Sequence, residues 1–385
     1  MSWLVYRMTG SAMLLGVVGF TSQIPSFLLA PVAGVLADRW DKRRLLLATQ
    51  ALALIQAALL AIIVLTGVVQ IWHIVLLSLF LGIVNAFDIP IRQSFVVQMV
   101  DSREDLSNAI ALNSSMVHGA RLIGPTIAGL LVASVGEGIC FAINSASYLA
   151  VIVALAAMRV APPPPRQQQH QVLHELHEGV LYAFNSKPIR SIILLLALIS
   201  LMGMPYAVLI PVFASEVLHG NSHTYGFLMT ATGSGALAGA CYLASRRSVI
   251  GLGMVIVRAA IFFGTGIAVF AISNNFTLSM ASLVLAGFGS MNLVASCNTI
   301  LQTIVDEDKR GRVMSFFTMA FIGMAPLGSL IAGALAGRIG AKETVLIGGI
   351  CCLAGGMIFF RQLPLLRKLI RPIYIDRGII QEKDI

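Results

Sequence analysis

The sequence is dominated by long apolar runs, and these runs constrain the fold more than any other feature. A membrane-spanning helix needs about 20 apolar residues. Eleven runs meet that need: 12–36, 45–66, 72–98, 106–134, 138–158, 190–216, 223–245, 250–273, 277–304, 312–337 and 342–361. Charged residues make up only 11% of the chain, against about 25% in soluble domains. Because so little charge cannot form a water-facing surface, the sequence predicts an all-α, polytopic membrane helix bundle.

The basic residues gather in every second connection between these runs. They are Arg39, Lys42, Arg43, Arg44, Arg103, Arg159, Arg166, Lys187, Arg246, Arg247, Lys309, Arg310 and Arg312, followed by Arg367, Lys368 and Arg371. The other connections carry almost none, with Arg338 and Lys342 as the exceptions. Since Lys and Arg mark cytoplasmic loops, we expect a multi-pass bacterial inner-membrane protein with a cytoplasmic C-terminus. The net charge of +9 forms no basic stripe interleaved with aromatics, so no nucleic-acid partner is expected.

The longest connection, 159–189, divides the chain into two halves. It opens with four prolines and continues as an amphipathic stretch. Three histidines of this stretch fall near one helical face, which leaves either a metal site or a solvated interfacial helix open: His170, His174 and His177. Residues 124–129 align with 328–333, an internal repeat typical of duplicated transporters. The predicted parts are a membrane half, the central loop, a second membrane half and a cytoplasmic tail: 1–158, 159–189, 190–362 and 363–385.

The connection after the first run carries a recognisable motif. It reads Gly34-Val-Leu-Ala-Asp38-Arg39-Trp-Asp41-Lys42-Arg43-Arg44. This resembles the major facilitator signature Gly-x-x-x-Asp-Arg-x-Gly-Arg-Lys, with Asp in place of the second Gly. The resemblance implies that Gly34, Asp38, Arg39, Lys42 and Arg43 form a latch that holds the two halves in the outward-facing state. A plain positive-inside anchor is the alternative.

Two further stretches, NAFDIPIRQSF (85–95) and DLSNAIALNSSMVHGARLIGPTIAGLL (105–131), resemble the enterobactin-exporter and macrolide-efflux-like branch of that superfamily. Within the second, Gly124, Pro125, Ala128 and Gly129 resemble the helix-packing motif Gly-Pro-x-x-Gly-Gly of drug/proton antiporters. The resemblance implies a major facilitator fold of two six-helix halves. In that fold WLVYRMTGS would end the first helix, so we expect that helix to begin before Met1 and about eleven spans to be present. A genuine eleven-helix protein is the alternative.

Ionisable residues inside membrane spans are costly and suggest function. Asp88 lies within its run, with Arg92 one turn later, while Arg121 and His118 lie in the next run. We expect Asp88 to pair with Arg121 or Arg92, either as a proton-coupling group or as a fixed structural ion pair. His118 could shuttle a proton or bond a neighbouring helix. Two polar residues that could line the same cavity are Asn85 and Asn113.

The sequence and the resemblance together favour a proton-coupled exporter of amphipathic small molecules, such as drugs or a siderophore. An importer, or a transporter-like sensor or scaffold, is the alternative. The expected partners are the lipid bilayer, a small-molecule substrate and protons. An enzyme is not expected, because the spans carry no paired-carboxylate motif and no metal cluster. Neither a cofactor nor a metal is expected.

Overall fold

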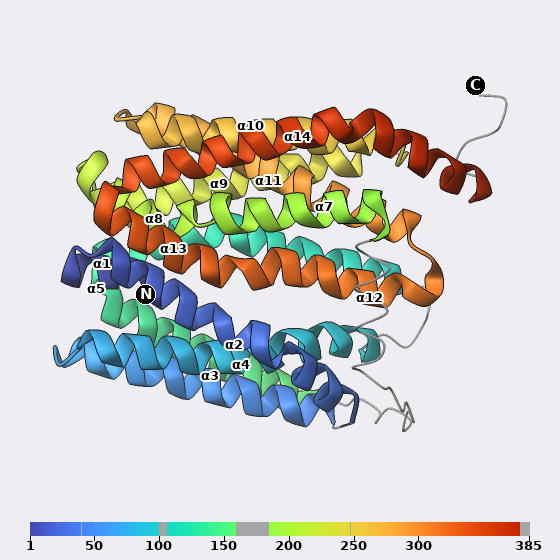
Figure 1. The fold of residues 1–385 in the computed structure, drawn as a ribbon. Helices are drawn as coiled ribbons and strands as arrows, with labels where there is room; N and C mark the ends of the chain where they lie inside the picture. The colour runs from blue at the N-terminus through green and yellow to red at the C-terminus, as the bar shows by residue number, and fades with distance from the viewer. Residues whose placement is uncertain (40, 100–105, 159–184, 247, 378–385) are drawn as a thin grey trace. The chain divides into compact units, whose positions relative to one another are not determined.

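A computed structural model describes residues 1–39, 41–99, 106–158, 185–246 and 248–377, and every regular element within them is a helix (Figure 1). The elements are α1 (Ser2–Thr9), α2 (Ala12–Arg39), α3 (Lys42–Leu65), α4 (Ile71–Gln98), α5 (Leu106–Ala157), α7 (Lys187–Leu198), η1 (Ile199–Gly203), α8 (Tyr206–Val212), η2 (Phe213–Val217), α9 (Ser222–Ala244), α10 (Leu252–Ile272), α11 (Phe276–Ile304), α12 (Glu307–Thr318), η3 (Met319–Gly323), α13 (Met324–Ile339) and α14 (Ala341–Asp376). The prediction of an all-helical protein is confirmed.

Ten helical segments of the described chain are long and apolar enough to cross a membrane. The sequence predicted eleven, and the difference lies in α5. This element spans both 106–134 and 138–158, but its backbone leaves the helical region at Gly136, where φ is 80° and ψ is 167°. A residue with a side chain is strained at such a φ, so glycine permits the break. Two helices therefore meet at Gly136, as the sequence predicted.

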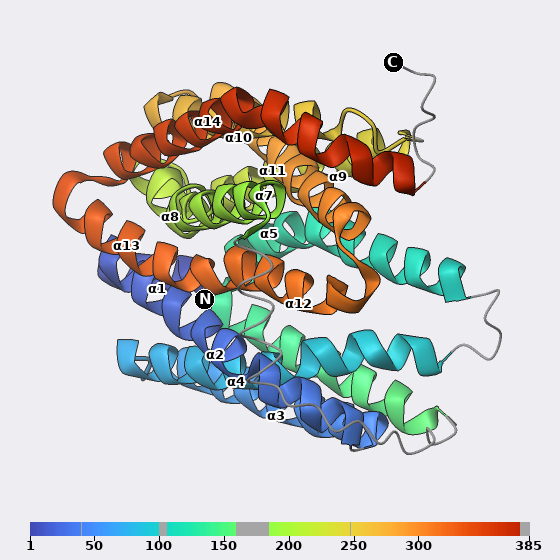
Figure 2. The same cartoon turned by 45° about the vertical axis from the view of Figure 1, so that its right-hand side comes forward.

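The chain divides into two compact units. One comprises Met1–Gln168, Val208–Thr230 and Ser329–Gly337, and the other comprises Gln169–Ala207, Ala231–Gly328 and Arg338–Ile385. In the first unit α2 packs on α4, while α3 packs on α4 and α5 (Figure 2). In the second, α10 packs on α11 and α14, and α7 packs on α14. Most of the central loop, including its three histidines, lies outside the described residues, so its amphipathic helix stays a prediction.

Small residues let helices of the second unit touch backbone to backbone. A Cβ atom on Gly235 of α9 would lie 1.9 Å from the carbonyl oxygen of Val284 on α11. A Cβ on Gly287 of α11 would lie 2.0 Å from the carbonyl oxygen of Thr232 on α9. No side chain fits at such distances. The two glycines therefore set how closely α9 and α11 approach, as small residues do in membrane helix pairs.

Within the described residues, three short π-helical segments lie in the longer spans: η1, η2 and η3. In η1 the Met204 amide donates to the Ile199 carbonyl five residues earlier, at 3.0 Å. The side chain of Ser200, fully buried in η1, donates to the carbonyl of Phe321 in η3. Two of these wide turns are thus joined within the second unit by a hydrogen bond from a buried serine.

Candidate functional site

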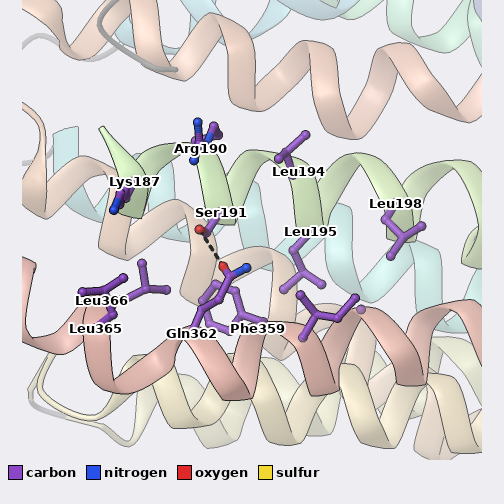
Figure 3. Close-up of a pocket in the computed structure, with 12 residues that line it drawn as sticks. Lys187, Arg190, Ser191, Leu194, Leu195, Leu198, Phe359, Gln362, Leu365 and Leu366 are labelled. Carbon is purple, nitrogen blue, oxygen red and sulfur yellow. Dashed lines mark hydrogen bonds between the residues drawn. The ribbon is translucent and has the colours of Figure 1, made fainter. Parts of the chain in front are cut away.

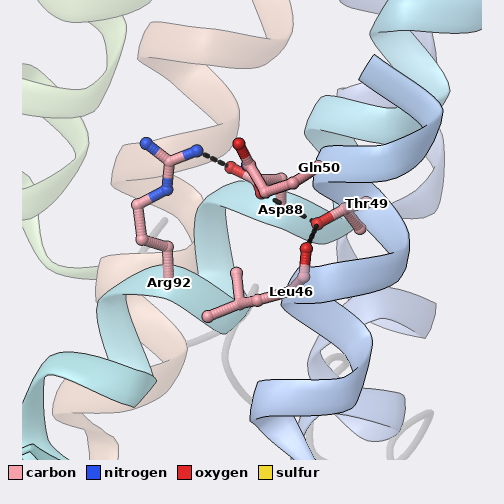
Figure 4. A network of polar contacts seen from close by, with 5 residues as sticks. All are labelled: Leu46, Thr49, Gln50, Asp88 and Arg92. Atoms are coloured by element: carbon pink, nitrogen blue, oxygen red, sulfur yellow. Dashed lines mark hydrogen bonds and ion pairs between the residues drawn. The ribbon is translucent and has the colours of Figure 1, made fainter. Parts of the chain in front are cut away.

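Asp88 is the centre of a buried polar network between α3 and α4 (Figure 4). The residue lies in the middle of α4 and is 3% exposed. Its Oδ1 accepts from the Thr49 hydroxyl at 2.9 Å and from the Gln50 amide at 2.6 Å, both on α3. Its Oδ2 accepts from the guanidinium of Arg92, one turn further along α4. Three donors therefore satisfy a carboxylate that burial alone would strongly destabilise.

The two partners of the ion pair differ in their exposure to solvent. The Asp88 side chain is 4% exposed, whereas the Arg92 side chain is 58% exposed. Arg92 can therefore be solvated without Asp88, but Asp88 depends on its protein donors for every hydrogen bond it makes. Of the two pairings that the sequence left open, the structure contains Asp88–Arg92. The side chains of Arg121 and His118 are outside the described residues.

Thr49 gives this network two alternative arrangements. Its hydroxyl also lies 3.0 Å from the carbonyl oxygen of Leu46, one turn earlier on α3. A hydroxyl has one proton, so it can donate to Leu46 or to Asp88 but not fully to both. When it donates to Leu46, its oxygen is free to accept a hydrogen bond from a neutral Asp88 carboxyl. The same atoms can thus serve both protonation states of Asp88.

An apolar cluster packs beside this network, towards the C-terminal ends of α4 and α5. Its buried members are Leu46, Ile91, Phe95 and Leu155. Ile91 and Phe95 follow Asp88 along α4, and Leu46 precedes Thr49 on α3, so the cluster shares helices with the polar network. Asn85, one turn before Asp88, and Asn113 on α5 are half-buried.

The described part of the predicted latch is built into the ends of α3 and α5. The Asp41 carboxylate caps α3 by accepting from the backbone amides of Arg43 and Arg44, at 2.9 and 3.3 Å. The Arg43 guanidinium donates to the carbonyls of Leu155 and Ala156 at the end of α5, at 2.8 and 2.5 Å. An acidic N-cap explains why Asp is accepted where the signature has Gly. Gly34, Asp38 and Arg39 belong to α2, but their side chains are outside the described residues.

The packing motif on α5 makes one close helix contact within the first unit. A Cβ on Gly129 would lie 2.9 Å from the Cα of Gly226 and 2.9 Å from the carbonyl oxygen of Ser222, both on α9. A Cβ on Gly124 would meet no described atom within 4 Å. Ala128 is exposed, and the Pro125 side chain is outside the described residues. Of the motif's described residues, Gly129 therefore makes the contact.

Sequence reasoning missed a second polar cluster, which we call the α1 cluster: Tyr6, Arg7, Glu137 and Glu216. The Arg7 Nε lies 3.0 Å from the Glu137 Oε1, directly after the break in α5. The Tyr6 hydroxyl donates to Glu216 in η2. One helical turn of α1 thus holds two carboxylates that lie far apart in the sequence. A basic residue inside the apolar run WLVYRMT was the available sequence signal.

The Arg7–Glu137 pair is unequally buried, which leads to an asymmetric prediction. Glu137 is 8% exposed and Arg7 56% exposed. Arg7→Gln leaves a buried carboxylate without its partner, so we expect a loss of about 2 kcal/mol in the free energy of unfolding. Glu137→Gln leaves a solvated guanidinium, so we expect a loss under about 1 kcal/mol. Thermal unfolding in detergent measures both, and a larger loss for Glu137→Gln would contradict the interpretation.

No group of three or more His, Cys, Asp or Glu side chains in the described part of the chain could hold a metal ion.

Comparisons with known proteins agree on a transporter. The family model described as "Transmembrane secretion effector" matches residues 1–369. The staphyloferrin A transporter of Staphylococcus aureus is 27% identical and covers 94% of this chain and 90% of its own. The multidrug efflux pump Tap of Mycolicibacterium fortuitum is 23% identical, covering 95% and 91%. Macrolide efflux protein A of Streptococcus pyogenes is 21% identical, covering 90% and 87%.

Solved structures of the same fold include two further transporters. The nucleoside transporter NupG aligns with a TM-score of 0.71 at 14% identity, covering 94% of this chain and 93% of that one. A bacterial homolog of the human lysosomal transporter Spinster, inward-facing and occupied, aligns with a TM-score of 0.68 at 14% identity, covering 93% and 90%. These likenesses show the major facilitator fold. The family model and the relatives show a transporter and not an enzyme. The chain therefore belongs to the transmembrane secretion effector family, a group of efflux-type transporters within the major facilitator superfamily.

Proposed function

We propose that this protein is a proton-coupled secondary exporter of amphipathic small molecules. The observation that carries the proposal is the buried Asp88 carboxylate, held by Thr49, Gln50 and Arg92. A buried carboxylate changes the charge of its surroundings when it binds one proton, so its protonation can favour one conformation over another. Ionisable side chains buried within membrane spans are costly and for that reason often mark functional sites.

The proposed coupling step uses only groups of this network. Proton binding neutralises Asp88 and removes most of its attraction for Arg92. The Thr49 hydroxyl then donates to the Leu46 carbonyl, and its oxygen accepts a hydrogen bond from the protonated Asp88 carboxyl. Arg92, already largely exposed, is released to other partners. For this to drive transport, the proton and the cargo must each bind the two access states with different affinity.

Cargo and location follow from the relatives and the charge pattern. Relatives named for staphyloferrin A, multidrug and macrolide transport support a drug or a siderophore as cargo. We place the protein in the bacterial inner membrane with its basic connections and C-terminus in the cytoplasm. The halves 1–158 and 190–362 would rock around a central site, joined by 159–189 and followed by the tail 363–385.

Other residues have proposed roles beside Asp88. Gly34, Asp38, Arg39, Lys42 and Arg43 would form the latch of one access state. Cavity or proton-path roles are proposed for His118, Arg121, Asn85 and Asn113.

Dye efflux from energised cells tests the proposal. An exporter-deficient bacterium that expresses the protein is loaded with a panel of fluorescent amphipathic dyes, and siderophore export is followed in parallel. We expect faster efflux than in control cells, and its loss when a protonophore collapses the proton gradient while ATP is maintained. Everted membrane vesicles with an imposed proton gradient fix the direction, since an exporter loads them and an importer does not. Protonophore-insensitive efflux would refute proton coupling.

A further inference from the structure

A groove between α7 and α14 has features that transport does not explain (Figure 3). Its volume is about 620 Å³. One wall is the face of α7 that carries Ser191, Leu194 and Leu198, and the other is the face of α14 that carries Ile358 and Gln362. The helices are joined across it by the Ser191 hydroxyl, which donates to the Gln362 Oε1 at 2.9 Å. Both walls belong to the second unit.

One end of the groove is cationic. Lys187 and Arg190, in the first turn of α7, line it and are exposed. Within the described part of the chain, neither has a carboxylate partner. The Gln362 side chain uses its oxygen for Ser191, which leaves its amide N–H groups as available donors. Two cations and a neutral donor make this end suited to a negatively charged group with further acceptor oxygens.

The rest of the groove is apolar and of defined length. Leu194 and Ile358 are 54% and 56% exposed. At the far end a Cβ on Gly355 would lie 2.5 Å from Leu198 Cδ2, so α7 and α14 close together there. From Lys187 to Leu198 the helix rises about 16 Å, close to the ~15 Å of one leaflet's hydrocarbon. The apolar wall therefore matches the reach of one acyl chain below its headgroup.

A second groove lies beside the first and repeats its chemistry. It has a volume of about 420 Å³ and shares Phe359 and Leu366 with the first groove. Arg367 and Arg371 line it together with Ile192 and other apolar side chains. Neither arginine is in an ion pair within the described residues. Each of the two grooves that share Phe359 and Leu366 of α14 is therefore lined by two basic side chains.

We propose that the α7–α14 groove binds an anionic phospholipid. Its phosphate lies between Lys187 and Arg190, its ester oxygens accept from Gln362, and one acyl chain follows Leu194 and Ile358. Basic pockets between membrane helices bind such headgroups. The inference rests on the membrane location of the chain and not on the cargo or the coupling ion.

Lipid titration by native mass spectrometry tests the proposal on the purified full chain. Each juxtamembrane cation contributes about 1 kcal/mol to binding anionic lipid, so Lys187→Gln with Arg190→Gln should weaken phosphatidylglycerol binding about 30-fold. The matched control, Arg361→Gln with Lys368→Gln, makes the same charge change on exposed residues of α14 that line neither groove. It should leave the affinity unchanged. Leu194→Trp, which fills the apolar wall without altering charge, should also weaken binding.

Three results would overturn the proposal. The first is that the parent and the Lys187→Gln, Arg190→Gln variant bind phosphatidylglycerol with equal affinity. The second is equally tight binding of phosphatidylcholine, because the cations would then contribute nothing. The third is displacement of the lipid by inorganic phosphate alone, which would make this an anion site and not a lipid site. A thermal unfolding curve for each variant confirms that it is folded, and efflux measured separately keeps this test apart from that of the proposed function.

Discussion

Asp88→Asn is expected to reduce proton-driven efflux at least about tenfold while the protein remains folded. Asparagine keeps the Oδ1 acceptor for Thr49 and Gln50. Its amide nitrogen faces the Arg92 guanidinium, but Arg92 is exposed enough to turn away. The substitution therefore removes the group that binds a proton and preserves most of the network. Efflux rates under an imposed proton gradient, at matched membrane levels, measure the effect.

Two controls make this result specific. Glu343→Gln removes an exposed carboxylate at the start of α14 and should leave efflux unchanged. Asp88→Glu keeps the titrating group with one more methylene and should recover part of the activity. Cargo binding by Asp88→Asn, measured without a gradient, should stay close to that of the parent. Full gradient-driven efflux by Asp88→Asn would refute the role of this carboxylate.

Gly235→Leu is expected to destabilise the second unit by at least about 3 kcal/mol. This is the upper end of the loss in stability that is typical when a larger side chain is forced into a packed core. The new Cβ would lie 1.9 Å from the Val284 carbonyl oxygen, and the obstacle is backbone that cannot rotate aside. The helices α9 and α11 would have to separate. A large fall in the thermal unfolding temperature, or the loss of monodisperse protein in detergent, measures the effect.

Gly337→Leu is the matched control for that experiment. The nearest described atom to a Cβ at this position is the Met13 Cβ at 3.8 Å, which is ordinary contact. Leucine also has the higher helix propensity, by about 0.8 kcal/mol. We therefore expect unchanged or slightly higher stability. Equal unfolding temperatures for the two leucine variants would contradict the prediction, because the close α9–α11 contact at Gly235 would then have no effect on stability.

The sequence predicted the spans because their signal is local. The break inside α5 could be predicted because the connection SVGEG interrupts two apolar runs, and Gly136 is the residue that allows the backbone to turn. The family was also identified correctly, since its motifs are short and contiguous. By contrast, the role of Asp41, which stands where the signature has Gly, could not be predicted. It depends on the position at which α3 begins, because the Asp41 carboxylate caps that helix by accepting from the backbone amides of Arg43 and Arg44.

The partners of Asp88 could be predicted only in part. Arg92 was a candidate because residues one turn apart lie on the same helix face. Thr49 and Gln50 were not, because the contact depends on how α3 is rotated about its axis against α4, and no periodicity specifies that rotation. The α1 cluster was missed for the same reason, since Tyr6 and Glu216 are brought together by the fold and not by spacing.

The three π-helical segments determine where this chain tolerates a change of length. A π turn closes its hydrogen bond over five residues, where an α turn closes it over four. Deleting one residue within η1 or η3 would let that segment become α-helical, and the helices on either side would keep the faces that they bury. The same deletion within α10 would rotate everything beyond it by about 100° and expose its buried face. Relatives that are one residue shorter should therefore carry the gap at η1 or η3.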